Sequence, residues 1–119
     1  RVLVGVSNMA QLMAESDLCI GAAGSTSWER CCLGLPTIQF VVADNQKQIN
    51  AALKLSDSVL TVQLERLKTE LSEVFAELTR PDVMFRLSKN AACVCDGLGA
   101  KKITTVLEKI TNEDHFALQ

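Results

Sequence analysis

Short apolar runs alternate with amphipathic segments along the chain. Four runs are short and rich in valine, isoleucine and leucine, as is typical of strands buried in a parallel sheet: residues 1–6, 17–22, 37–42 and 58–62. Apolar residues recur at helical spacing elsewhere, which predicts helices over residues 7–16, 25–34, 44–56, 63–78, 81–92 and 99–111. This alternation predicts an α/β fold with a parallel sheet.

Composition fits one modest domain. The chain has 119 residues, of which 48% are hydrophobic, and this content excludes a disordered chain. The net charge is −2 without a basic cluster, which argues against a nucleic-acid or anionic-membrane surface. No apolar run approaches the ~20 residues of a membrane span. We expect the opening residues not to be a signal peptide, because they lack a long apolar core and a cleavage pattern. Because the chain opens on Arg1 inside an apolar run, we expect residues 1–119 to be one partial domain of a longer protein.

Cysteine spacing gives no metal or disulfide framework. Cys31 and Cys32 are adjacent, and Cys93 and Cys95 are separated by one residue, so neither pair has the two-residue spacing of a zinc or redox motif. We expect five reduced thiols in a bacterial cytoplasmic protein. No clustered acids indicate a magnesium site, and we expect no metal and no cofactor.

The segment "GAAGSTSWERCCLGLP", from Gly21 to Pro36, carries the candidate chemistry. Small residues follow a predicted strand and open a helix, at the sheet edge where α/β proteins bind ligands. The backbone from Gly21 to Gly24 can approach a ligand closely, and the following amides and hydroxyls favour a phosphate. The motif is neither a Walker loop nor G-x-G-x-x-G, so a plain tight turn with a helix cap remains the alternative.

Glu29 has two readings that the residues alone leave open. Thr26 to Glu29 fits the capping box, in which the carboxylate accepts from the amide of the cap residue. A carboxylate could instead accept two hydrogen bonds from a ribose diol. We expect Trp28 to pack rather than to stack on a base. Arg30 is expected to be exposed and solvated, with neutralisation of a phosphate as the alternative.

The stretch "DLCIGAAGSTSWERCCLGLPTIQFVVADNQ", residues 17–46, closely resembles one family of nucleotide-sugar enzymes. These are the UDP-2,4-diacetamido-2,4,6-trideoxy-β-L-altropyranose hydrolases of the pseudaminic acid pathway. More distantly, it resembles the peptidoglycan N-acetylglucosaminyltransferases, which make lipid II. The segment "DGLGAKKI", residues 96–103, also fits, whereas residues 56–92 carry no matching motif. The resemblance implies a three-layer, Rossmann-like parallel sheet, the carboxyl-terminal half of a GT-B fold whose amino-terminal part is missing.

The resemblance also implies a UDP-binding site. Glu29 would hold the ribose of UDP, and the amides from Gly24 to Thr26 would face the diphosphate. Asn45 and Gln46 would face the sugar and diphosphate; the alternative is that they form the exposed first turn of a helix capped by Asp44. The candidate binding residues are Gly24, Ser25, Thr26, Glu29, Asn45, Gln46, Ser7 and Asn8. Ser7 and Asn8 follow the first predicted strand, so we expect them at the same sheet edge, where they would border the uracil.

The implied reaction releases UDP and a 2,4-diacetamido-2,4,6-trideoxyhexose, on the way to pseudaminic acid and flagellin glycosylation. The family's catalytic histidine belongs to the absent half, and His115 is expected beyond the last helix, so this chain holds no catalytic residue and should be inactive alone. The alternatives are a UDP-sugar-dependent glycosyltransferase of cell-surface polysaccharide synthesis and a non-catalytic nucleotide-binding or assembly module. Expected partners are UDP or a UDP-sugar, the amino-terminal domain, and a second copy that pairs exposed apolar surfaces.

Overall fold

Three short parallel strands form the sheet of this computed structural model, which describes residues 1–116, with side chains described through residue 111. The strands β1 (Cys19–Ala22), β2 (Thr37–Phe40) and β3 (Leu60–Thr61) lie side by side in that order. Cys19 pairs with Thr37, and Ile38 pairs with Leu60, so all strands end at one edge. The α/β class with a parallel sheet is therefore confirmed.

Among the described residues, six helices lie at the six predicted segments, and the last two run a few residues beyond the predicted ends. They are α1 (Met9–Ala14), α2 (Thr26–Cys32), α3 (Lys47–Leu55), α4 (Leu67–Leu78), α5 (Pro81–Val94) and α6 (Gly99–Phe116). The 3-10 turns η1 (Asp44–Gln46) and η2 (Leu64–Arg66) lead into α3 and α4. Gly34 follows α2 with a φ of +60°, a conformation that favours glycine, and Pro81 is the first residue of α5.

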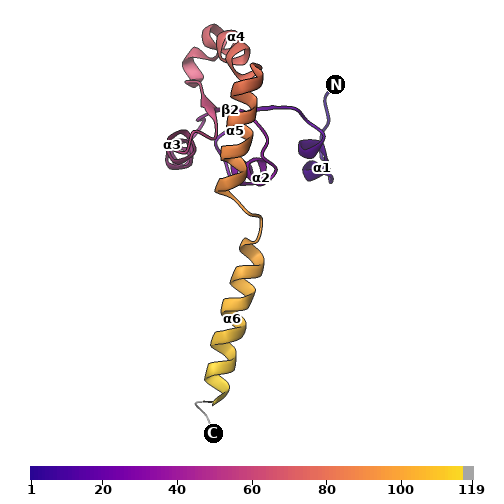
Figure 1. Cartoon of the computed structure of the whole chain (residues 1–119), viewed down its shortest axis with the longest axis vertical. Helices are drawn as coiled ribbons and strands as arrows, with labels where there is room; N and C mark the ends of the chain where they lie inside the picture. The colour runs from indigo at the N-terminus through magenta and orange to yellow at the C-terminus, as the bar shows by residue number, and fades with distance from the viewer. Residues whose placement is uncertain (117–119) are drawn as a thin grey trace.

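Helices cover both faces of β2, which gives the three predicted layers (Figure 1). Ile38 points to one face and packs with residues of α4 and α5. Gln39 points to the opposite face, where its side chain meets α2 and α3. The first core cluster contains Ile38, Val62, Leu78, Val83 and Leu87, and the second contains Cys31, Leu53, Val59 and Ala91. Since α5 contributes to both clusters, it ties the two faces together.

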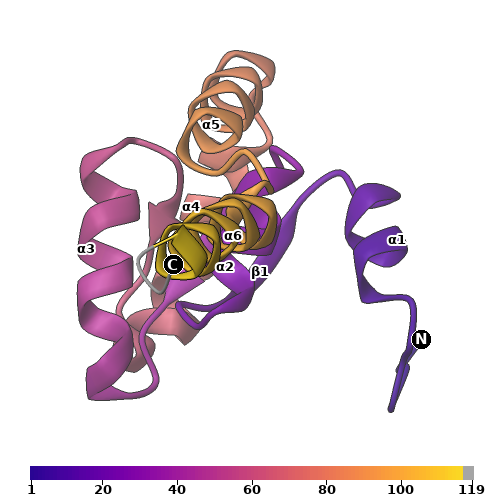
Figure 2. The ribbon, with the colours of Figure 1, turned by 90° about the horizontal axis from the view of Figure 1, so that it is seen from below.

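The prediction of a buried strand over residues 1–6 is wrong. Val2 and Val4 are 88% and 89% exposed, and within the described chain this segment pairs with no strand. Figures 1 and 2 show it leading to α1, which stands to the side of the sheet. The segment has strand-like composition but no neighbour to supply the backbone hydrogen bonds, and β1 is left as the edge strand.

Helix α6 extends away from the rest of the molecule, as Figure 1 shows. The chain therefore measures 68 × 30 × 27 Å. Asp96 braces the start of this helix, since its carboxylate accepts from the Leu98 amide and pairs with Lys102 at 2.6 Å. The hydrogen bond from Lys102 holds the pKa of Asp96 below its usual range. The helix runs through Phe116, so the expectation that His115 lies beyond the last helix is wrong; its side chain falls outside the described part.

Candidate functional site

A tight turn follows β1 at the carboxyl edge of the sheet. The Ala23 amide donates to the Phe40 carbonyl at 2.9 Å, which keeps the turn beside the end of β2. Among the described residues, the amides of Gly24, Ser25 and Thr26 have no hydrogen-bond acceptor. Three consecutive free amides can donate to one anion, which is the arrangement that phosphate-binding turns share.

Gln46, in the loop that follows β2, lies next to the turn that follows β1. Its Nε2 lies 3.9 Å from the position that a Cβ on Gly24 would occupy. Its Oε1 accepts from the Val42 amide at 3.0 Å, so the side chain is held in place. Asn45 is exposed next to it in η1. The structure thus brings Gln46 to the Gly24 turn, the place that the resemblance of residues 17–46 implied for it.

Glu29 is exposed on α2, and its carboxylate makes no hydrogen bond to any described residue. The N-cap residue of α2 is Ser25 rather than Thr26, and no side chain caps the helix. The capping box is therefore not formed. Thr26 and Glu29 are three residues apart on the helix, which places their Cβ atoms about 5–6 Å from each other. A carboxylate about one helical turn from the free Thr26 amide can contact a group attached to a phosphate bound there.

Arg30 is buried, which contradicts the expectation that it is exposed and solvated. Only 4% of the residue is exposed, and its guanidinium lies against β1. The Nη2 donates to the Ala22 carbonyl at 2.7 Å, and Nη1 lies 3.5 Å from the Cys19 thiol. The space for this group exists because position 21 is glycine: a Cβ there would stand 2.5 Å from Nη1.

A buried polar network extends from Arg30 across the sheet. Ser27 accepts from Arg30 at 2.8 Å and donates to the Gln39 amide oxygen at 2.9 Å. The Gln39 amide nitrogen donates to Asn50 of α3 at 3.0 Å. Ser27 and Gln39 are 1% and 0% exposed, so the network occupies an interior normally filled by apolar side chains. Sequence reasoning missed it, although Gln39, a polar residue inside the apolar run from Ile38 to Val42, was a signal.

A cleft of about 830 Å³ opens beside this network, where β2 and β3 end. Asn50 lines it together with Lys54 of the same helix. Its other lining residues are Val41, Val42, Ala43, Asp44, Lys47, Thr61, Val62, Gln63, Leu64, Glu65, Arg66 and Glu70. The cleft shares the segment from Val41 to Asp44 with the loop that carries Gln46. None of its polar residues was predicted to bind a ligand, but all lie at the end of β3 or in segments that follow β2 and β3.

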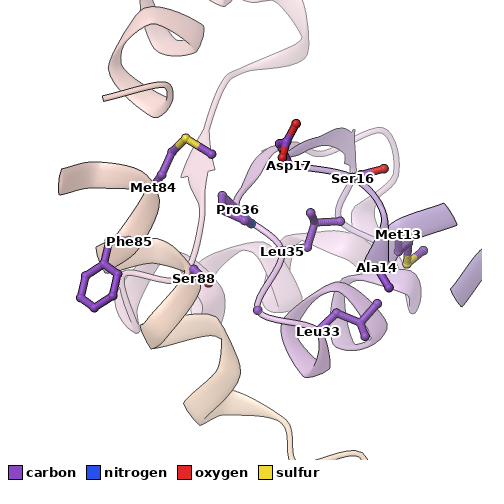
Figure 3. A pocket seen from close by; sticks show the side chains of 11 residues that line it. Met13, Ala14, Ser16, Asp17, Leu33, Leu35, Pro36, Met84, Phe85 and Ser88 are labelled. Carbon is purple, nitrogen blue, oxygen red and sulfur yellow. The ribbon is translucent and has the colours of Figure 1, made fainter. Parts of the chain in front are cut away.

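A second cavity, of about 340 Å³, lies at the opposite edge of the sheet (Figure 3). Asp17 and Pro36, which line it, precede β1 and β2. The remaining lining is mainly apolar and comes from α1, the loop after α2, and α5. No candidate binding residue reaches this cavity, and the carboxyl edge remains the better site because loop chemistry and free amides meet there.

Ser7 and Asn8 are exposed and precede α1. Figures 1 and 2 show α1 standing apart from the sheet, and the only side-chain hydrogen bond of Asn8 in the described chain goes to Gln11. The structure does not bring these two residues to the Gly24 turn. Their assignment to a uracil pocket stays a prediction.

Trp28 and Cys31, both on α2, differ in burial. Trp28 is 38% exposed, so its ring is only partly packed. Cys31 is buried in the second core cluster. Burial raises the pKa of the Cys31 thiol, and the neighbouring Arg30 partly offsets that shift. Cys31 is therefore a packing residue with little thiolate at neutral pH.

Neither a metal-ligand cluster nor a membrane-spanning helix is found among the described residues. No group of three or more His, Cys, Asp or Glu side chains is arranged to hold a metal ion there. No described helix combines the length and the apolar character that crossing a membrane requires.

Comparison with known proteins shows the family of this chain. Residues 4–109 match the model of the glycosyltransferase family 28 C-terminal domain. The UDP-N-acetylglucosamine–N-acetylmuramyl-(pentapeptide) pyrophosphoryl-undecaprenol N-acetylglucosamine transferases of Helicobacter acinonychis (strain Sheeba) and Helicobacter pylori (strain 26695) are each 35% identical over 82 residues. The alignments cover 64% of this chain and 23% of each transferase, so the match spans about a quarter of those relatives. No solved structure matches significantly.

Proposed function

Since the chain belongs to the glycosyltransferase family 28 C-terminal domain family, we propose that it binds the UDP part of a nucleotide sugar at the carboxyl edge of its sheet. The Helicobacter relatives are named for UDP-N-acetylglucosamine, which supports a uridine nucleotide as the ligand. The observation that carries the proposal is the set of three free amides from Gly24 to Thr26, which faces no acceptor in the described chain.

Each group at this edge then has a role. The free amides donate to the diphosphate, while Gln46, anchored on the Val42 amide, keeps its Nε2 free to donate to the same oxygens. Glu29 accepts from the ribose hydroxyls, for which its uncommitted carboxylate supplies two oxygens. Asn45 contacts the sugar from η1. The carboxylate stays away from the phosphates, because like charges repel in a partly dry site.

The activity of the whole protein is most consistent with sugar transfer from UDP to an acceptor. The family match and the Helicobacter transferases both favour this class. Hydrolysis of a UDP-2,4-diacetamido-2,4,6-trideoxyhexose in pseudaminic acid synthesis is the second candidate. The resemblance of residues 17–46 to those hydrolases, including the run from Trp28 to Cys32, is the observation that favours it. Either activity would use further residues outside this chain.

Isothermal titration calorimetry with UDP and uridine tests the binding role. We expect UDP to bind at least tenfold more tightly than uridine, because only UDP offers oxygens to the free amides. Equal affinities would remove the phosphate role from the turn. A release assay with UDP-N-acetylglucosamine and with the diacetamido sugar nucleotide should show no turnover by this chain alone; turnover would place catalytic groups among the residues assigned to binding.

A further inference from the structure

We propose that Arg30 is a positioning residue of the diphosphate site. It is a buried cation that supports the Gly24 turn through its hydrogen bond to the Ala22 carbonyl, and the bound anion neutralises its charge. The inference rests on the proposed function, because it assumes that the turn receives a diphosphate. Arg30 would contribute to the affinity for UDP through electrostatic attraction to the diphosphate, without direct contact between the guanidinium and the ligand.

The first argument is the missing counter-charge. No carboxylate of the described residues lies within 4.0 Å of the Arg30 guanidinium. Its acceptors are a carbonyl, a hydroxyl, an amide oxygen and a thiol, all neutral. Its Nε is buried without any partner. Buried charges in proteins are normally paired, so an unpaired guanidinium here indicates that its counter-charge arrives with a ligand.

The second argument is the position of the charge. Arg30 donates to Ala22, the last residue of β1, and the free amides begin two residues later at Gly24. Two peptide units span at most about 7.6 Å between Cα atoms, so an anion on these amides lies near the guanidinium. The medium between them is protein interior, in which a charge acts more strongly than in water.

The third argument is the fit of the group. Gly21 pairs with Gln39 across the sheet, and the guanidinium fills the space that the absent side chain of Gly21 leaves. Arg30 donates a hydrogen bond to Ser27, and Ser27 donates one to Gln39. Gln39 in turn donates to Asn50, which lines the cleft. The same guanidinium therefore fixes both the end of β1 and the first turn of α2, the two sides of the Gly24 turn.

Two substitutions separate charge from packing. Arg30→Gln removes the cation, and we expect its affinity for UDP to fall about tenfold while its affinity for uridine changes less than twofold. Arg30→Lys should restore at least a third of the UDP affinity. The control is Arg86→Gln, which removes the same charge at the opposite edge of the sheet, where Arg86 pairs with Asp57, and should leave both affinities unchanged.

The outcomes distinguish the two proposals. If the unsubstituted chain fails to prefer UDP over uridine, the phosphate role of the turn is wrong. If it prefers UDP and Arg30→Gln keeps that preference, only the role of Arg30 is wrong. Should Arg30→Gln and Arg30→Lys not fold, nitrogen-15 NMR of the unsubstituted chain decides: saturating inorganic pyrophosphate should shift the Arg30 Nε–H resonance and uridine should not. An unmoved resonance in bound protein overturns the inference.

Discussion

Gly34 lies directly against Ser88, so the end of α2 meets the middle of α5 without space for a side chain. A Cβ on Gly34 would stand 3.1 Å from the Ser88 carbonyl oxygen and 3.2 Å from its Oγ. The residue also has a φ of +60°, which L-residues adopt at a cost. This contact allows the end of α2 to pack tightly on α5. It thereby helps to fix the position of α2, the helix that carries Glu29 and Arg30.

Replacing Gly34 by alanine should therefore destabilise the chain. We expect Gly34→Ala to lower the free energy of unfolding by about 1–2 kcal/mol from the backbone conformation alone, and further from the contact with Ser88. Urea unfolding followed by circular dichroism measures the change. Gly99→Ala is the control, because no atom lies within 4 Å of its added Cβ, and it should alter stability by less than about 0.5 kcal/mol. Equal effects of the two would show that Gly34 has room.

The free carboxylate of Glu29 predicts a change in binding without a change in folding. Glu29→Gln should weaken UDP binding by about 1–3 kcal/mol, since a charge-assisted hydrogen bond is replaced by a weaker one. Its stability should change by less than about 1 kcal/mol, because the carboxylate caps no helix. Calorimetry and thermal unfolding give the two values. Glu77→Gln, an exposed change on α4, should alter neither, and a loss of stability with unchanged affinity would reassign Glu29 to folding.

Thiol reactivity should follow burial and pKa. All five cysteines should titrate as reduced thiols once freshly prepared protein is denatured. In the native chain, exposed Cys32 and Cys93 should react first with a disulfide reagent, and Cys31 last, because burial raises its pKa and reduces its thiolate. Kinetics with a chromogenic disulfide measures the order. Fewer thiols in denaturant, or a fast-reacting Cys31, would contradict the prediction.

Exposed apolar surface predicts self-association. The outer edge of β1 is unpaired in the described chain, and Ile20 and Phe75 beside it are 42% and 41% exposed. Helix α6 adds an exposed apolar stripe: Ile103, Val106, Leu107 and Ile110. Open edges and such stripes favour association, so light scattering should give about twice the 12.9 kDa mass of the chain. Ile103→Lys with Val106→Lys should shift the mass toward a monomer. A monomeric unsubstituted chain would contradict the argument.

The sequence predicted the helices, three of the strands and the turn chemistry, because these depend on local periodicity and on glycine and proline positions. It failed at residues 1–6, where apolar composition was sufficient for the prediction but a strand needs a neighbour for its backbone hydrogen bonds. No local signal reports whether a neighbour is present. The proximity of Gln46 to Gly24 was implied by the family resemblance, and it agrees with the rule that the loops after parallel strands lie at one edge of the sheet.

Arg30 shows why burial of polar residues could not be predicted. An arginine in the first turns of a helix is usually solvated, and nothing next to it in the sequence indicates otherwise. The deciding residue is Gly21, on another element, whose missing side chain creates the space. Asn50 and the cleft were missed for the same reason, since their role depends on Gln39 across the sheet.

The projecting helix α6 would amplify small rotations at its base into large displacements at its far end. Its 18 residues make a rod about 27 Å long, joined to the end of α5 by the short segment from Cys95 to Leu98. A rotation of about 10° at that joint would carry the far end through about 5 Å, which follows from the helical rise of each residue. Small adjustments where α5 meets α2 would thus be magnified into a large displacement far from the ligand edge.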